Sequence, residues 1–158
     1  MDVDAAVADR LAALGLALPE PPAPAGAYQP GVIRGAVGWL SGQFPIGGGR
    51  PLMTGVIGRD LTLAQGRHAA RLAGLNVLAQ IQRLLGSFAR LEGLLRVDGC
   101  VASAPGWFEQ PAVLDSASEL FIAALGPERG AHARSAIATP LLPMNLPVEL
   151  VVTFAVRQ

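Results

Sequence analysis

The sequence predicts an α+β fold in which two helices cover one face of a mixed β-sheet. Two segments have apolar residues at helical spacing, several others alternate like strands, and the strands come before, between and after the helices. The predicted order is ββ(β)αβαββ, preceded by an N-terminal helix and a proline-rich arm. Helices on one face would leave the other face of the sheet bare.

The N-terminal region combines a helix with an arm. Residues 3–19 begin as an amphipathic helix, which Asp2 or Asp4 is expected to cap and Gly15 to end. The next segment, PEPPAPAGAYQP, is too rich in proline for a helix or a central strand, so an ordered, extended arm is expected. We divide the chain into residues 1–30, the helix and arm, and residues 31–158, the main unit, within one structural domain.

The strands of the main unit are expected in four stretches, with a loop and a short strand after the first. Residues 31–45 predict a strand pair, and residues 46–58 the loop and short strand. Alternating apolar residues predict a strand over 91–103, and the last two strands are expected at 134–139 and 146–156.

The two predicted helices have clear start and stop signals. Residues 60–86 form the stronger one, with Asp60 or Thr62 as N-cap and Gly86 as C-cap. Residues 106–126 form the second, which starts near a proline and stops at a glycine.

Composition indicates an oligomer. The chain is 51% hydrophobic and 15% charged, with a mean hydropathy of +0.42, whereas soluble domains carry about 25% charged residues. No membrane span is expected, because the best helical segment, residues 61–85, contains three arginines and a histidine. The acidic N-terminus is unlike a secretory signal. We therefore expect a cytoplasmic protein that buries apolar surface between subunits.

Charge and cysteine content argue against several classes of function. The formal net charge is zero, and all twelve basic residues are scattered arginines, so no nucleic-acid surface is expected. Without lysine, the chain cannot form a Schiff base with a carbonyl substrate. Cys100 is the single cysteine, so neither an intrachain disulfide nor a Cys-rich metal site is expected. No metal or other cofactor is predicted.

Three segments carry a family resemblance: AGAYQPGV, WLSGQFP and ARSAIATPLLPMNLPVELVV. Their order and spacing resemble the RidA/YjgF family of reactive intermediate deaminases, also called L-PSP endoribonucleases. The N-terminal helix, the arm and the two helical segments are similar to its YjgF/chorismate mutase-like subfamily. The resemblance covers about residues 24–156.

The resemblance implies a fold, an assembly and a reaction. The fold is chorismate-mutase-like, in a homotrimer whose sheets pack into a central barrel-like core with clefts between subunits. The reaction is cofactor-free hydrolysis of small enamines and imines bearing a carboxylate, which gives 2-keto acids and ammonia. The residues that it implies as catalytic are Glu149, Tyr28 and Ser41, and those for substrate binding are Arg134, Gly42 and Ser135.

The chain departs from the family at two places. Ala136 stands where the family often has a cysteine, two residues after its substrate-binding arginine. The asparagine of the family's second helix has no match, and Leu114 or Asp115 occupies that region. These departures bear on substrate identity and on the activity itself.

Arg134 and Glu149 are two charges in an apolar C-terminal run. A guanidinium matches a carboxylate in bidentate fashion, which suits substrate binding. The alternative is a structural Arg134–Glu149 pair that holds two strands in register. We expect these strands to pair, so that both side chains face one cleft, where apolar neighbours and the arginine shift the carboxyl in opposite directions.

Other functions remain as alternatives. The same trimer fold without catalysis would bind or sense small carboxylates. An endoribonuclease is less consistent, because neither His68 nor His132 has a visible catalytic partner and no basic groove is present. Chorismate mutase activity would need several cations in one cleft, and the sequence places one arginine there.

Overall fold

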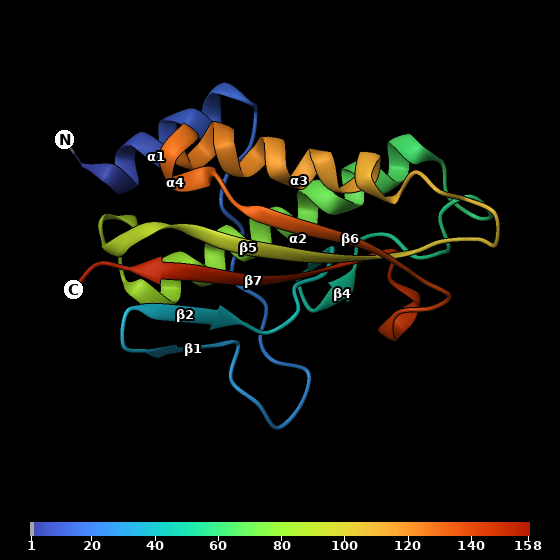
Figure 1. The fold of residues 1–158 in the computed structure, drawn as a ribbon, viewed down its shortest axis with the longest axis horizontal. Coiled ribbons are helices and arrows are strands. Elements are labelled where there is room, and N and C mark those ends of the chain that lie inside the picture. Colours follow the sequence, from blue (N-terminus) through green and yellow to red (C-terminus); the bar gives the residue numbers. More distant parts are fainter. Residues whose placement is uncertain (1) are drawn as a thin grey trace.

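The computed structural model describes residues 2–158, which form a five-stranded sheet, a small hairpin and helices (Figure 1). In spatial order, the sheet strands are β1 (Gly31–Arg34), β2 (Val37–Leu40), β7 (Val148–Val156), β5 (Leu91–Ala102) and β6 (Ala133–Thr139). The hairpin consists of β3 (Ile46–Gly47) and β4 (Arg50–Pro51). The helices are α1 (Val3–Ala13), α2 (Leu63–Leu85), α3 (Gln110–Leu125) and α4 (Pro127–Gly130), with 3₁₀ turns η1 (Phe88–Arg90) and η2 (Pro143–Asn145).

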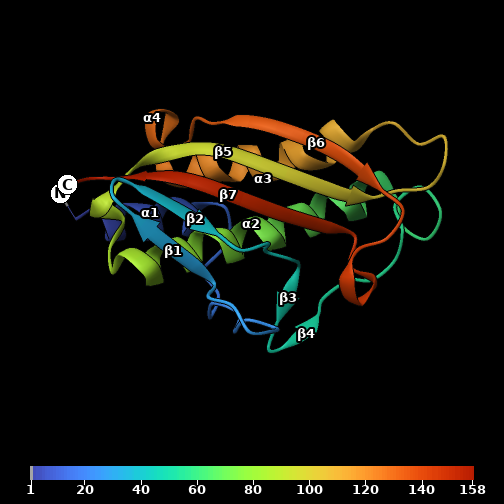
Figure 2. The same ribbon diagram turned by 60° about the horizontal axis from the view of Figure 1, so that its bottom comes forward.

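The sheet is mixed, as predicted. The β5–β6 pair is parallel, and α3 makes the crossover between these two strands. The other neighbouring strands pair antiparallel. Figure 2 shows the sheet in front with α2 and α3 behind it, so the long helices share one face.

Local sequence signals explain the helix boundaries. Thr62 caps α2 in a capping box with Gln65, and Gly86 ends it in the left-handed conformation, with φ 78°. Asp2 caps α1 through hydrogen bonds from backbone N–H groups of the first turn. Asp4 accepts from the Phe88 amide and from the side chains of Gln82 and Ser87, and this ties α1 to the end of α2.

The core lies between the helices and the sheet. On β7, Val148, Leu150, Val152 and Phe154 are fully buried and alternate with partly exposed residues. Because successive side chains of a strand point to opposite faces, the intervening residues lie on the open face of the sheet. In the single chain this face exposes Trp39, Ile137 and Val151. No helix in residues 2–158 is long and apolar enough to span a membrane.

The predicted pairing of the last two strands is wrong. β5 lies between β6 and β7, so the strands that carry Arg134 and Glu149 are not neighbours. The run between them, which contains η2, therefore crosses past β5 instead of making a tight hairpin. Sequence order suggested a pair, whereas parallel pairing of β6 with β5 placed it at the sheet edge.

Candidate active site

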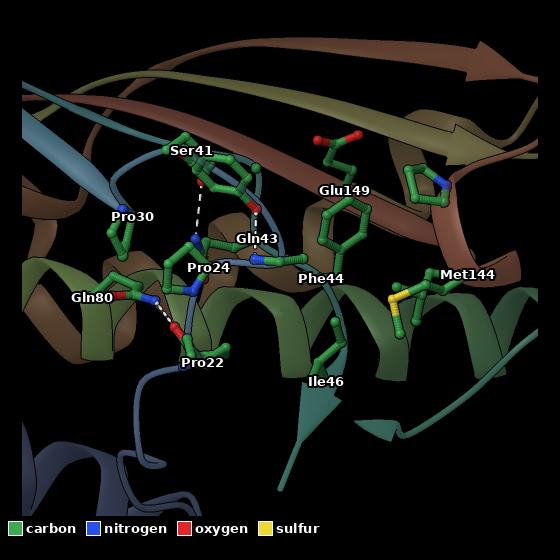
Figure 3. Close-up of a pocket in the computed structure, with 16 residues that line it drawn as sticks. Pro22, Pro24, Pro30, Ser41, Gln43, Phe44, Ile46, Gln80, Met144 and Glu149 are labelled. Atoms are coloured by element: carbon green, nitrogen blue, oxygen red, sulfur yellow. Dashed lines mark hydrogen bonds between the residues drawn. The ribbon is translucent and has the colours of Figure 1, made fainter. Parts of the chain in front are cut away.

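A cavity of about 460 Å³ lies between the proline-rich arm, the segment after β2, the η2 turn and β7 (Figure 3). Four of the six predicted site residues line it: Tyr28, Ser41, Gly42 and Glu149. The other lining residues are Pro22, Ala23, Pro24, Ala25, Pro30, Gln43, Phe44, Ile46, Gln80, Pro143, Met144 and Leu146. Glu149 is the only charged residue among them, and the wall is otherwise largely apolar.

Glu149 lies near the start of β7, on the face opposite Val148 and Leu150. Within residues 2–158 its carboxylate forms no ion pair. Burial raises the pKa of the Glu149 carboxyl above its ordinary value, because a partly desolvated carboxylate is disfavoured. A carboxyl of this kind takes up and releases protons nearer to neutral pH than an exposed glutamate.

Gly42 makes room for this carboxylate. A Cβ atom at Gly42 would collide with Glu149 Oε1 and would lie 2.8 Å from its carboxyl carbon. The glycine is needed for close approach and not for its backbone angles, since its φ lies outside the left-handed region. The absence of a side chain at Gly42 therefore lets the carboxylate occupy this position in the cavity.

The two hydroxyl residues are part of the arm's hydrogen bonding. The Tyr28 hydroxyl oxygen accepts from the Ala25 amide at 3.1 Å, which leaves its proton available to donate. The Ser41 hydroxyl donates to the Gln29 carbonyl at 2.7 Å and keeps its lone pairs free. Tyr28 can thus act as a donor in the cavity and Ser41 as an acceptor.

Two buried amides of α2 hold the cavity wall, and the sequence reasoning missed both. Asn76 donates from Nδ2 to the Phe44 and Ile46 carbonyls, at 2.8 and 2.9 Å. Gln80 donates from Nε2 to the Pro22 carbonyl at 2.8 Å, as Figure 3 shows. Both residues are at most 2% exposed. The sequence signal for them is that they are polar residues on the apolar stripe of α2. Buried amides need hydrogen-bond partners, so such residues indicate specific tertiary contacts.

Arg134 is not in the cavity. Its Nη1 atom donates to Asp115 Oδ1 at 2.9 Å and to Ser118 Oγ at 3.1 Å, and Nη2 donates to the Pro111 carbonyl at 3.3 Å. These partners belong to α3, so Arg134 lies on the helix face of the sheet, whereas Glu149 lies on the open face. The expectation that both face one cleft is wrong within a single chain, and so is the alternative Arg134–Glu149 ion pair.

Ser135 points to the face opposite Arg134, the open face. Its hydroxyl accepts a hydrogen bond from Arg96 Nη2 at 2.6 Å, and Arg96 is also paired with Asp98 at 2.8 Å. Ser135 does not line the cavity. The six predicted residues therefore fall into two groups, one in the cavity and one on the edge strand β6.

The described residues offer no cation inside the cavity and no metal-ligand cluster. The lining contributed by residues 2–158 contains no lysine, arginine or histidine. Elsewhere in this range, no three His, Cys, Asp or Glu side chains gather closely enough to hold a metal ion. The groups that this chain alone provides in the cavity are therefore one carboxyl, hydroxyl groups, the side-chain amides of Gln43 and Gln80, and apolar surface.

Comparisons with known proteins match nearly the whole chain. The family model described as "YjgF/chorismate_mutase-like, putative endoribonuclease" matches residues 8–156. Protein TCP17 of Trypanosoma cruzi is 38% identical over 144 residues, which cover 91% of this chain and 90% of that protein. The crystal structure of Atu1372 from Agrobacterium tumefaciens, whose function is unknown, is 35% identical, with a TM-score of 0.92 and coverage of 98% and 95%. E. coli TdcF with bound serine shares the fold at 20% identity, with a TM-score of 0.60 and coverage of 88% and 94%.

Proposed function

Because the chain belongs to the YjgF/chorismate mutase-like family, we propose that it hydrolyses small enamines or imines that carry a carboxylate, giving 2-keto acids and ammonia. The observation that carries this proposal is the carboxyl of Glu149, which lies in a cavity without an ion-pair partner in residues 2–158 and with a raised pKa. Resting structural carboxylates usually have partners, whereas a carboxyl that exchanges protons with a ligand needs an open side.

The reaction needs little from the protein. Water adds to the imine carbon, a proton reaches nitrogen, and the carbinolamine loses ammonia as its hydroxyl becomes the keto oxygen. Glu149 accepts a proton from the attacking water, returns it to the departing nitrogen, and takes the hydroxyl proton as the C–N bond breaks. The Tyr28 hydroxyl donates to the substrate, and Ser41 accepts from the water or from the substrate N–H. Positioning and one acid–base group account for the rate.

The substrate carboxylate requires a cation that the cavity of one chain lacks. Trp39, Ile137 and Val151 expose apolar surface on the open face, which supports association through this face. We place Arg134 and Ser135, on the edge strand β6, at the cavity of a neighbouring subunit in a homotrimer. TdcF, which shares the fold, binds serine, a small molecule with a carboxylate.

The test compares Arg134→Ala with Arg71→Ala, since Arg71 is an exposed arginine of α2. Turnover of 2-aminoacrylate or 2-iminobutanoate should fall at least about 30-fold in Arg134→Ala, because an unpaired carboxylate in a cleft costs 2 kcal/mol or more. Arg71→Ala should match the wild type, and so should the oligomeric mass of both variants. Equal rates for the two variants would remove Arg134 from the reaction.

A non-catalytic carboxylate-binding trimer is the second candidate. The observation that favours it is Ala136, which stands where the family often has a cysteine. In that case 2-keto acids would raise the melting temperature of the wild type but not of Arg134→Ala, and no imine would be turned over.

A further inference from the structure

The proline-rich arm forms an apolar wall on one side of the cavity that Glu149 also lines. Pro22, Ala23 and Pro24 form this wall, and Phe44 and Ile46 face it from the segment after β2. The wall belongs to the same chain as Glu149, so it does not depend on how subunits associate. The side chain of the substrate is the group that this wall would contact, so the inference rests on the proposed function.

Specific hydrogen bonds hold the arm in place. Gln80, which is 1% exposed, donates from α2 to the Pro22 carbonyl at 2.8 Å. Farther along the arm, the Ser41 hydroxyl donates to the Gln29 carbonyl at 2.7 Å. Pro22 and Pro24 restrict the backbone of the wall itself, so the wall is preorganised rather than formed on binding.

The size and polarity of this region identify its occupant. A cavity of about 460 Å³ is in the range of sites for drug-sized ligands, about 300–1,000 Å³, whereas the side chain of 2-aminoacrylate is a single methylene group. Glu149 is the only charge in the lining and would repel an anionic side chain. Hydrocarbon of the bulk of a leucine or phenylalanine side chain fits both conditions.

We propose that the arm, together with Phe44 and Ile46, forms a side-chain subsite that selects imino acids with a branched or aromatic hydrocarbon side chain over the imines of alanine or glutamate. The subsite lies next to the carboxyl of Glu149, which acts on the imine, and the arm contacts the far end of the side chain. Each methylene group of the substrate that an apolar subsite buries increases kcat/KM, and one methylene changes specificity by about 10-fold or more.

The experiment measures kcat/KM for imines produced in situ by an amino acid oxidase from alanine, leucine, phenylalanine and glutamate. The wild type should prefer the leucine and phenylalanine imines at least about tenfold over the other two. Ala23→Phe, which fills the subsite, should lower the phenylalanine-to-alanine ratio about tenfold. Ala27→Phe, on the same arm but outside the lining, is the matched control and should keep the wild-type ratio.

Two results separate this inference from the proposed function. Turnover with a preference for the alanine imine, or an unchanged ratio in Ala23→Phe, would overturn the subsite and leave the reaction in place. If no imine is turned over, calorimetric titration with phenylpyruvate and pyruvate decides instead. Tighter binding of phenylpyruvate that Ala23→Phe weakens supports the subsite, and equal binding of the two acids overturns it.

Discussion

The cavity and the sheet edge each contain one charged site residue, Glu149 and Arg134, and the two differ in whether the charge has a partner. The carboxyl has no ion-pair partner in the described part of the chain, and burial raises its pKa. The guanidinium, in contrast, is satisfied by Asp115, Ser118 and a backbone carbonyl of α3. One region is open to a ligand, and in the other a ligand must compete with a protein carboxylate.

This difference shows how a sheet separates residues that are close in sequence. Arg134 pairs with Val97 on β5, and Val97 pairs in turn with Val152 on β7, so the arginine points to the helix face. Glu149 lies in the row of Cys100 and points to the other face. In our proposal an interface between subunits joins the two half-sites, so a substitution can alter one half-site and leave the other unchanged.

The largest effect is expected for Glu149→Gln, which removes proton exchange and keeps the shape of the cavity. The value of kcat for imine hydrolysis should fall about 100-fold or more, with little change in KM. Steady-state kinetics over a pH series provides the measurement, and the ionisation seen in the wild-type profile should disappear. Glu109→Gln is the control, since Glu109 is exposed and its side chain does not cap α3. A variant that keeps half of the wild-type kcat would exclude Glu149 as the acid–base group.

A smaller effect is expected for Gly42→Ala, which adds a methyl group where the Glu149 carboxylate lies. The flexible end of the glutamate must move, so kcat should fall about tenfold through misplacement, while the melting temperature stays close to that of the wild type. Gly93→Ala is the matched control in β5, because its Cβ would meet neighbours at an ordinary 3.5 Å. Wild-type kcat in Gly42→Ala would mean that the position of the carboxylate is unimportant.

The sequence predicted the elements of the fold well but not how they bring the site together. Helical spacing and caps placed α2 within three residues at either end, because those signals are local. Strand order is not a local property, and β6 and β7 were wrongly paired although β5 lies between them. The family resemblance predicted roles for Tyr28, Ser41, Gly42 and Glu149; these four residues line one cavity, and their roles stay a prediction. It did not identify Asn76, whose bonds to the cavity backbone depend on tertiary contacts.

Asp115→Asn tests the competition at the other half-site. It removes the negative charge paired with Arg134 at 2.9 Å, so a substrate carboxylate should bind more tightly and KM should fall about threefold. Glu119→Gln is the control, because it breaks a different exposed ion pair of α3, the one with Arg67. A rise in KM would contradict competition and would show instead that Asp115 orients the arginine for binding.

The smallest effect is expected in the free energy of unfolding of Glu149→Gln. It tests whether the Glu149 carboxyl is unpaired, in contrast to the paired Arg134. Because folding raises the pKa of Glu149, the folded state binds its proton more tightly than the unfolded state. The contribution of Glu149 to stability is therefore fully present below the unfolded pKa and is lost as the pH rises through the folded pKa. Glu149→Gln should then be more stable than the wild type near pH 8, by about 0.5 kcal/mol for a half-exposed group, and the difference should disappear near pH 3 to 4. Urea unfolding at both pH values measures this difference. A neutral variant that is less stable than the wild type at pH 8 would contradict an unpaired, partly buried carboxylate at this position.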